Sequence, residues 1–356
     1  MLKTRSVALD GLFAGGIEGG HAQAAAFERR APYRLQMECC SECSADCAYC
    51  YARVMKGAEP LSTREIKGLL RRAASLGIKE VDWMGGDPLE RPDWIELLQA
   101  ARYAGMTNNL WTCGPRLNDI VTAKRVIELT RDGFVAVHLD SLEPDVLQAL
   151  RHTYNPRQVG DTFAGLELLL EAGKPPHEVA NLIMLTAHHT PEDVEATMSY
   201  MHQRYGVRTI LMSLKPVDER GALYAHLPRA EDVNLAYRHR DEMFLSGHGM
   251  GCQDVPKQYC GTCIFVSLDG DVSSCYALRR TLGNVREQTL EDIVQAHSSS
   301  LFFTPYRGID HGASCSACDG EACWGCRANA FYFGNGVYGE DPLCQHSRGT
   351  SDNCPY

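Results

Sequence analysis

Strand-like and helix-like segments alternate along the chain from residue 33 to residue 244, and this alternation limits the fold more than any other feature. Strands are expected at 33–37, 80–83, 110–112, 134–140, 179–186 and 208–213. Helices are expected at 62–76, 91–104, 117–130, 143–151, 162–172, 191–205 and 230–244, the first opened by a capping box of Ser62 and Glu65. Strands that alternate with helices in this way predict parallel βα units and an α/β fold.

Two arrangements of such units remain open on the pattern alone, a βα barrel and a doubly wound open sheet. An open sheet of the nucleotide-binding kind carries a glycine-rich turn after its first strand. Here the segment after 33–37 has no such turn and instead holds Cys43, Cys47 and Cys50. Sites of βα barrels form at the carboxyl ends of the strands, which is where these cysteines fall.

Cys43, Cys47 and Cys50, called the triad below, have the spacing C-x3-C-x2-C, with Tyr49 directly before the last cysteine. Three thiolates on one short loop can hold three irons of a cubane [4Fe–4S] cluster and leave the fourth iron without a protein ligand. An open coordination position is typical of catalytic rather than structural metal sites. A structural zinc site is the alternative, but it needs a fourth ligand from the cysteines just before the loop, and the spacing is unusual for zinc.

Cysteine content and charge exclude several classes of protein. Sixteen cysteines would suit disulfides only in an exported chain, and residues 1–20 lack the apolar core of a signal peptide. No apolar run reaches the ~18 residues that a membrane span needs. The formal charge of −10 disfavours nucleic-acid binding, which needs a basic surface. We therefore expect a cytoplasmic protein that binds neither membrane nor nucleic acid.

The cysteines also divide the chain. Five lie at 39–50, ten lie from Cys252 onward, and only Cys113 lies between these two groups. The glycine-containing segment at 246–249 is typical of a linker. We predict an N-terminal extension at 1–32, a βα domain at 33–247 and a small, irregular cysteine-rich domain at 248–356.

The triad resembles the signature of the radical S-adenosylmethionine (SAM) superfamily, which has this spacing and an aromatic residue before the last cysteine. In that family the open iron chelates SAM, and an electron from the cluster cleaves SAM to methionine and a 5′-deoxyadenosyl radical. The resemblance implies a partial (β/α)6 TIM-like barrel with the cluster on the loop after the first strand. It also implies a catalytic role for Cys43, Cys47 and Cys50.

Two further segments resemble SAM-binding motifs of that superfamily. Alone, the Gly-Gly-Asp-Pro turn after the second strand is an ordinary strand-to-helix turn, but it resembles the family's Gly-Gly-Glu-Pro, which meets the SAM amino group. The fourth strand ends in His-Leu-Asp, where the family often has Ser-Leu-Asp and its first residue contacts the SAM ribose. A histidine can still do so, or it can be a satisfied residue at the barrel mouth. The implied SAM-binding residues are Tyr49, Gly85, Gly86, Asp87, Pro88, His138 and Asp140.

The C-terminal cysteines resemble the SPASM extension, which carries up to two auxiliary [4Fe–4S] clusters. The match rests on Cys260-x9-Gly270-x4-Cys275, on Cys315-x2-Cys318-x4-Cys323-x2-Cys326 and on Gly-Glu-Asp-Pro-Leu-Cys344, with two inner gaps each one residue shorter than usual. By analogy, one auxiliary cluster takes Cys260, Cys275 and Cys326, with Cys252 as fourth ligand. The other takes Cys315, Cys318, Cys323 and Cys344.

The remaining cysteines and histidines receive weaker predictions. Two zinc knuckles are the alternative for the C-terminal cysteines, because C-x2-C pairs also suit zinc. Cys263 and Cys354 are spare thiols that could replace a ligand, Cys39 and Cys40 are expected to pack beside the loop, and Cys113 has no evident role beyond a strand end. His188 and His189, after the fifth strand, are expected to be solvated and without a role.

The resemblance implies an enzyme that abstracts a hydrogen atom from a substrate carbon while auxiliary clusters accept or relay an electron. Many SPASM relatives modify ribosomally made peptides, so a peptide is the leading substrate. The segment Cys323-x2-Cys326-Arg-Ala also resembles relatives that decarboxylate or trim tetrapyrroles in haem-type cofactor synthesis. A non-catalytic iron–sulfur electron carrier or a zinc-stabilised interaction module is the third class, and the SAM-site pattern beside the triad disfavours it.

The expected partners follow from this chemistry. The cluster needs a reductant such as flavodoxin or ferredoxin. Many peptide maturases carry an N-terminal module that grips a leader peptide, but the residues at 1–32 are fewer than a domain usually needs. We therefore expect either a separate peptide-recognition protein or a different, small-molecule substrate.

Overall fold

The computed structural model describes residues 16–52, 58–217, 221, 223–244, 257–304, 325–334 and 336–343. In this part of the chain a nine-stranded sheet runs in the order β6-β5-β4-β3-β2-β1-β7-β8-β9. Its strands are β1 (Arg34–Cys40), β2 (Glu80–Gly85), β3 (Thr107–Thr112), β4 (Val135–His138), β5 (Val179–Leu185), β6 (Arg208–Ser213), β7 (Cys263–Val266), β8 (Asp271–Ser273) and β9 (Gly283–Asn284).

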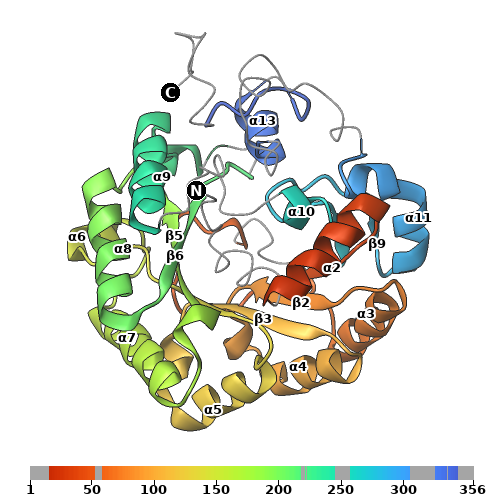
Figure 1. The fold of residues 1–356 in the computed structure, drawn as a ribbon, viewed down its shortest axis with the longest axis horizontal. Helices are drawn as coiled ribbons and strands as arrows, with labels where there is room; N and C mark the ends of the chain where they lie inside the picture. Colours follow the sequence, from red (N-terminus) through yellow and green to blue (C-terminus); the bar gives the residue numbers. More distant parts are fainter. Residues whose placement is uncertain are drawn as a thin grey trace, which may run out of the picture.

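The first six strands pair in parallel with their sequence neighbours, which confirms the βα units. Helices follow the strands: α3 (Thr63–Ser75), α4 (Trp94–Tyr103), α5 (Ile120–Leu129), α6 (Pro144–Ala149), α7 (Pro156–Glu171), α8 (Pro191–Tyr205) and α9 (Ala230–Phe244). Figure 1 shows these helices around the outside of the curved sheet. The arrangement is a partial TIM-like barrel rather than an open sheet with helices on both faces.

The remaining helices of the described residues lie beside the C-terminal strands or on the side of the molecule that the curved sheet leaves open (Figure 1). They are α2 (Gly16–Arg29), α10 (Lys257–Cys260), α11 (Leu290–Leu301) and α13 (Arg327–Phe333). Helix α2 contributes Phe27 to a hydrophobic cluster with Ala277, Leu278 and Phe303, so the N-terminal extension packs on the C-terminal region. None of the helices in the described ranges is long and apolar enough to cross a membrane.

Capping residues explain why the helix limits follow the sequence closely. The Ser62 side chain accepts from Glu65 N while Glu65 returns a bond to the Ser62 backbone, which confirms the predicted capping box of α3. Helix α8 has the predicted limits because Thr190 caps its start and Gly206, at φ 69°, ends it in the left-handed region. Helix α7 begins six residues before the predicted position 162, because Asn155 caps it and Pro156 occupies its first turn.

The cysteine-rich C-terminal region continues the sheet of the barrel. Strand β7 pairs in parallel with β1, with Arg34 opposite Cys263 and Met37 opposite Val266. Strands β8 and β9 then extend the edge in antiparallel fashion. The predicted boundary at 247 and 248 lies outside the described residues and stays a prediction. Within the described ranges, one sheet joins the two regions.

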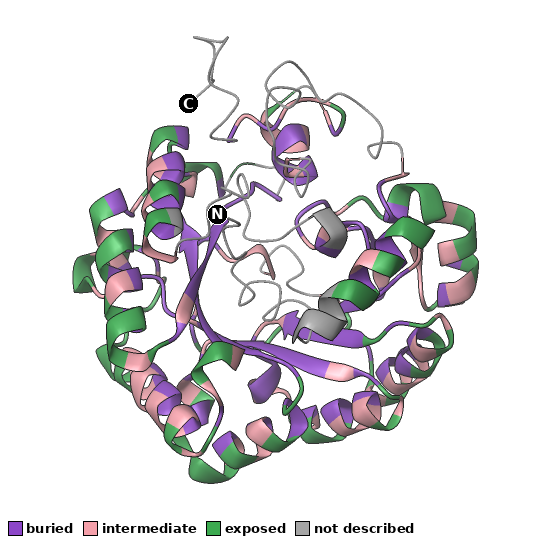
Figure 2. Cartoon of the chain, in the orientation of Figure 1, coloured by how far each residue is buried: buried purple, intermediate pink, exposed green. Residues whose placement is uncertain are grey.

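The sheet is buried on both faces. Every residue of β1 and of β5 is buried, as helix-covered parallel strands require. Figure 2 shows the same division across the molecule, with buried strands inside and exposed residues on the outer faces of the helices. Inside the barrel, Arg34 forms ion pairs with Glu80 at 2.5 Å and with Asp82 at 2.7 Å. The hydroxyl of Tyr259 donates to Asp82 over 2.6 Å and so ties the C-terminal region to this network.

Candidate active site

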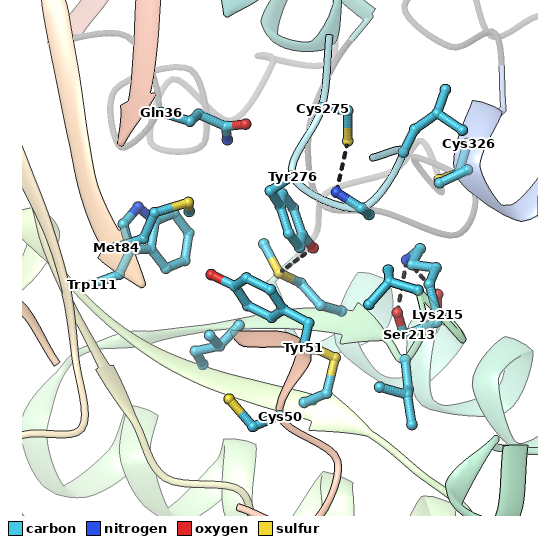
Figure 3. A pocket seen from close by; sticks show the side chains of 18 of the residues that line it. Gln36, Cys50, Tyr51, Met84, Trp111, Ser213, Lys215, Cys275, Tyr276 and Cys326 are labelled. Atoms are coloured by element: carbon cyan, nitrogen blue, oxygen red, sulfur yellow. Dashed lines mark hydrogen bonds between the residues drawn. The ribbon is translucent and has the colours of Figure 1, made fainter. Parts of the chain in front are cut away.

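A cavity of about 170 Å³ lies at the carboxyl ends of the parallel strands. The triad cysteines line it together with Cys260, Cys275 and Cys326 of the C-terminal region. Most of its wall is apolar or aromatic, and Figure 3 shows Trp111 and Met84 on one side of it and Tyr51 and Tyr276 in its middle. The position agrees with the rule that barrel sites form where the strands end.

The loop that carries the triad is fixed by backbone contacts to the segment between α6 and α7. The Ala48 amide donates to the Leu150 carbonyl over 2.9 Å, and the His152 amide donates to the Asp46 carbonyl over 3.0 Å. Asp46 adopts a φ of 49°, a left-handed conformation that aspartate tolerates better than most residues. These bonds hold the three cysteines near one another before any cofactor is considered.

Arg151 is the residue in this segment that acts most directly on the triad, and no sequence motif pointed to it. Its Nη1 donates to Cys47 Sγ over 2.8 Å and to the Ala45 carbonyl over 3.0 Å. Its Nη2 lies 3.6 Å from Asp140 Oδ2. Burial raises the pKa of Cys47, and the guanidinium opposes this rise by offering a charge-assisted hydrogen bond to the thiolate, which is the form that binds iron.

Asp140 organises two of the predicted SAM-binding residues. Its fully buried carboxylate accepts from the Tyr49 hydroxyl over 2.5 Å and lies 2.8 Å from His138 Nε2. Burial alone would raise the pKa of Asp140, but His138 and Arg151 beside it hold that pKa well below its usual range. His138 is half-buried and lines the cavity, so its ring is both satisfied by Asp140 and open to a ligand.

The two glycines after β2 are required by the triad loop. A side chain on Gly85 would place its Cβ 2.6 Å from the Cys40 carbonyl oxygen, and one on Gly86 would place it 2.1 Å from the Glu42 carbonyl oxygen. Gly85 also has a φ of 124°, which other residues rarely adopt. The turn therefore packs directly against the start of the cysteine loop, and both glycines line the cavity.

Both oxygens of the Asp87 carboxylate accept hydrogen bonds that fix this turn. Oδ1 accepts from the Leu89 amide over 3.0 Å, Oδ2 accepts from the Cys113 amide over 3.0 Å, and the Thr112 hydroxyl donates to the same carboxylate over 2.8 Å. These bonds join the turn, including Pro88 at the start of its short 3-10 helix, to the end of β3. The side chain is fully buried, and burial raises the pKa of Asp87 to about 6.

Cys113 lies beside the triad, which the sequence did not indicate. Its Sγ is 3.3 Å from Cys43 Sγ, and it lines the same cavity at the end of β3. The contact lowers the pKa of Cys43, mainly through the hydrogen bond that Cys113 supplies. The available signal was positional, because residues directly after parallel strands gather at one end of a barrel.

The C-terminal cysteines divide into those that the structure describes and those that it does not. Cys260 at the end of α10, Cys275 after β8 and Cys326 before α13 come together at the cavity, and Cys263 at the start of β7 also lines it. The other predicted ligands lie outside the described residues: Cys252, Cys315, Cys318, Cys323 and Cys344. The spare Cys354 lies outside them too.

Two predictions about isolated residues have different outcomes. Cys39 and Cys40 are buried in the main hydrophobic core, as expected. The prediction that His189 is solvated is wrong, because the ring is only 6% exposed and its Nδ1 accepts from the Thr186 amide at 3.2 Å. Its Nε2 lies 3.2 Å from the Asp140 carbonyl. The histidine therefore closes the turn after β5 behind Asp140 rather than facing solvent.

The donor chemistry of the cavity fits iron–sulfur clusters. Sulfur is the ligand type that such clusters use, and the triad brings three thiols to one end of the cavity. Among the described residues, no three histidine, cysteine or acidic side chains converge tightly enough to hold a single metal ion.

Comparison with protein families gives two matches. The model of the radical SAM superfamily matches residues 37–201, which include the triad and the Gly-Gly-Asp-Pro turn. The model of the SPASM iron–sulfur cluster-binding domain matches residues 258–326. The two matches therefore cover the barrel strands β1 to β5 and the described C-terminal cysteines.

Individual relatives are distant. A probable GTP 3′,8-cyclase of Methanothermobacter marburgensis is 27% identical over 190 residues, which cover 52% of this chain and 59% of the relative, less than two thirds of its length. The PqqA peptide cyclase of Granulibacter bethesdensis is 26% identical over 335 residues, which cover 88% of this chain and 87% of the relative.

Solved structures support the fold. SuiB of Streptococcus suis, bound to its precursor peptide SuiA, superposes with a TM-score of 0.65 at 16% identity, over 92% of this chain and 80% of SuiB. At this identity the likeness shows the fold alone. The matched families exclude the non-catalytic alternatives of an electron carrier and a zinc module. The chain belongs to the radical SAM superfamily with a C-terminal SPASM region, and it is an enzyme of the kind that uses [4Fe–4S] clusters and S-adenosylmethionine.

Proposed function

We propose that this enzyme abstracts a hydrogen atom from a carbon of a ribosomally made peptide. The observation that carries the proposal is one continuous cavity lined both by the triad and by Cys260, Cys275 and Cys326. A substrate in this cavity lies between the place where a radical is generated and a second group of thiols suited to an electron-accepting cluster.

The relatives support a peptide as the substrate. The PqqA peptide cyclase matches along 88% of this chain, and SuiB has been solved both with its precursor peptide and with SAM. The cavity wall also suits a peptide side chain, because Met84, Met184 and Met212 are adaptable apolar contacts. The reductant in the cell would be a small electron carrier such as flavodoxin or ferredoxin.

In this proposal Cys43, Cys47 and Cys50 hold the catalytic cluster, and Arg151 supports the ionised Cys47. When bound, the cluster supplies the electron that cleaves SAM to methionine and a 5′-deoxyadenosyl radical. The proposed SAM-binding residues remain Tyr49, Gly85, Gly86, Asp87, Pro88, His138 and Asp140.

Their roles differ, because both Asp87 oxygens already accept hydrogen bonds. Contacts from this turn to the SAM amino group would therefore come from its backbone. His138 would meet the ribose from the cavity wall, while Asp140 fixes the positions of His138 and Tyr49 from behind.

The C-terminal cysteines would receive the electron that the substrate radical must lose. One auxiliary cluster would use Cys252, Cys260, Cys275 and Cys326, and the other would use Cys315, Cys318, Cys323 and Cys344. Two partly buried aromatic residues on the cavity wall, Tyr51 and Tyr276, lie against each other with ring centroids 5.4 Å apart. They help to exclude water from the space where a carbon radical would form.

The test uses enzyme reconstituted anaerobically with iron and sulfide, reduced with dithionite and supplied with SAM. The substrates are perdeuterated peptides encoded by reading frames beside the gene. We expect 5′-deoxyadenosine that carries deuterium from the peptide, together with a changed peptide mass. Deuterium transfer shows that the radical takes hydrogen from the peptide itself, because uncoupled SAM cleavage does not label the product.

The matched control is the variant Cys43→Ala/Cys47→Ala/Cys50→Ala. It should retain about 8 of about 12 irons and form no 5′-deoxyadenosine. Deuterium transfer from a tetrapyrrole and not from any peptide would favour decarboxylation or trimming of that ring instead. Absence of 5′-deoxyadenosine while all clusters are present by spectroscopy would refute both functions.

A further inference from the structure

Lys215 is a buried cation without a carboxylate partner among the described residues. It follows β6 and is only 3% exposed. Its Nζ donates to the Ser213 carbonyl over 2.7 Å and to the Ser213 hydroxyl over 2.9 Å. An ammonium group has three hydrogens, so these two neutral acceptors leave one donor and the whole charge unmatched.

The other buried lysine of the described chain shows what a satisfied site looks like. Lys174, 1% exposed, donates to the carbonyls of Thr130 and Gly133 and forms an ion pair with Glu178 at 2.6 Å. It therefore has three acceptors, one of which is a carboxylate. Because burial of an unpaired charge costs several kcal/mol, the missing carboxylate at Lys215 needs an explanation.

The surroundings of Lys215 point to a ligand. Lys215 and Ser213 line the active-site cavity, and Figure 3 places them at its wall on the side of Cys326. No aspartate or glutamate is among the described residues that line this cavity. Arg327, the other cation on the wall, donates to the carbonyls of Val337 and Gly339. Among the described lining residues, the acidic groups that face this positive charge are thiols such as Cys275, and no carboxylate matches it.

We propose that Lys215 binds the carboxylate of an aspartate or glutamate side chain of the substrate, and so holds an acidic residue beside the reacting carbon. The inference rests on the proposed function, since it names a feature of that peptide. An ion pair formed away from water is stronger than one at the surface, so this contact would select acidic over amide side chains. Ser213 orients the ammonium group from behind.

Two other negative groups could pair with Lys215 in place of a substrate carboxylate. One is the carboxylate of SAM itself. The other is Asp218 or Glu219, which follow closely in the sequence and lie outside the described residues. Lys215 also acts electrostatically on Cys275, which places it toward the C-terminal cysteines rather than toward the Gly85–Gly86 turn. This favours the substrate over SAM, and the experiment separates all three.

The experiment measures binding of two blocked tripeptides, acetyl-Ala-Glu-Ala-amide and acetyl-Ala-Gln-Ala-amide, to the cluster-loaded enzyme by calorimetry without reductant. The wild type should bind the glutamate peptide about tenfold more tightly than the glutamine peptide. Lys215→Met should lose this preference while its SAM affinity and iron content stay unchanged. Lys215→Arg should keep part of it. Lys67→Met, which removes a half-buried lysine that pairs with Glu96 on the outer helices, is the matched control and should behave as wild type.

The outcomes are separable. Equal affinity for the two peptides in the wild type, or no binding of the glutamate peptide at millimolar concentration, overturns the proposal even if Lys215→Met fails to fold. If Lys215→Met keeps the preference for the glutamate peptide, the proposal is also overturned. It is overturned too if Lys215→Met loses SAM affinity to the same extent as peptide affinity. A glutamate preference without deuterium transfer from any peptide would leave this site intact and refute the proposed function.

Discussion

Asp87 and Asp140 are both fully buried carboxylates, just after β2 and β4, yet their pKa values move in opposite directions. Burial raises both values, but only Asp140 has basic side chains beside it, namely His138 and Arg151. Asp87 receives neutral donors from Thr112 and from two backbone amides, which offset the cost of burial only in part. The same residue type is therefore held by basic side chains in one case and by neutral hydrogen-bond donors in the other.

The raised pKa of Asp87 predicts a pH dependence of stability. The value is about 6 in the folded chain against 3.8 as the ordinary value, so the folded state binds this proton more tightly than the unfolded state does. The stabilisation is complete below pH 3.8 and is lost as the pH rises through about 6. The loss amounts to about 3 kcal/mol of unfolding free energy.

Urea unfolding of the protein without clusters, between pH 4 and 7, measures this effect against Asp87→Asn. The stability of the wild type relative to the variant should fall across that range. Glu171→Gln, at an exposed helical position, should show a constant difference and serves as the control. A constant difference for Asp87→Asn as well would contradict the raised pKa.

At the scale of elements, the site depends on one close contact between two segments that are far apart in the sequence. The turn after β2 packs on the beginning of the triad loop, where the Gly86 amide donates to the Cys40 carbonyl over 2.7 Å and the Asp87 amide donates to the Glu42 carbonyl over 2.6 Å. Glycine is needed at position 86 because a Cβ there would overlap the backbone of the triad loop. The turn thus positions the loop, whatever else it binds.

Gly86→Ala should therefore displace the triad loop. Its Cβ would lie 2.1 Å from the Glu42 carbonyl oxygen, a contact that only a backbone shift can relieve. We expect the variant to lose about four irons after reconstitution and to cleave no SAM. Iron analysis and 5′-deoxyadenosine assays measure the two effects.

Gly160→Ala is the matched control, because that glycine lies within α7 and a Cβ there meets nothing within 4 Å. It should retain all irons and gain up to about 1 kcal/mol of stability. Full iron content and SAM cleavage in Gly86→Ala would show that the close contact is not required.

For the molecule as a whole, the main consequence of the sheet topology is that the barrel does not end at β1. Strand β7 hydrogen-bonds to β1 over four residue pairs, from Arg34–Cys263 to Met37–Val266. Ile264 and Val266 are fully buried in the same hydrophobic core as Leu35 and Met37. Removal of the C-terminal region would expose both a strand edge and part of that core.

A chain that ends at residue 244 should therefore fail to form a stable monomer. We expect it to aggregate in size-exclusion chromatography and to lack a cooperative thermal transition, because β1 would present unpaired backbone groups beside exposed apolar residues. A chain that ends at residue 304 keeps β7, β8, β9 and α11 and should stay monomeric. A monomeric shorter chain with the melting temperature of the full protein would show that the barrel folds alone.

The sequence by itself determined the βα order, most helix limits and the cysteine loop at the mouth of the barrel. These features depend on local patterns: hydrophobic periodicity, caps such as Ser62 and Thr190, and spacing within one loop. The predicted SAM-binding residues Tyr49, His138 and Asp140 form one network, as their strand-end positions suggested.

Only the tertiary structure decided which distant residues complete the site. Arg151, Cys113 and Lys215 belong to no motif. Cys113 and Lys215 line the cavity because a parallel strand ends there, and Arg151 contacts Cys47 from the segment between α6 and α7. The pairing of β7 with β1 could not be predicted from the sequence either, since strand pairing across more than two hundred residues leaves no local pattern. Local periodicity records how a segment folds, whereas contacts between segments depend on how the whole sheet curves and closes.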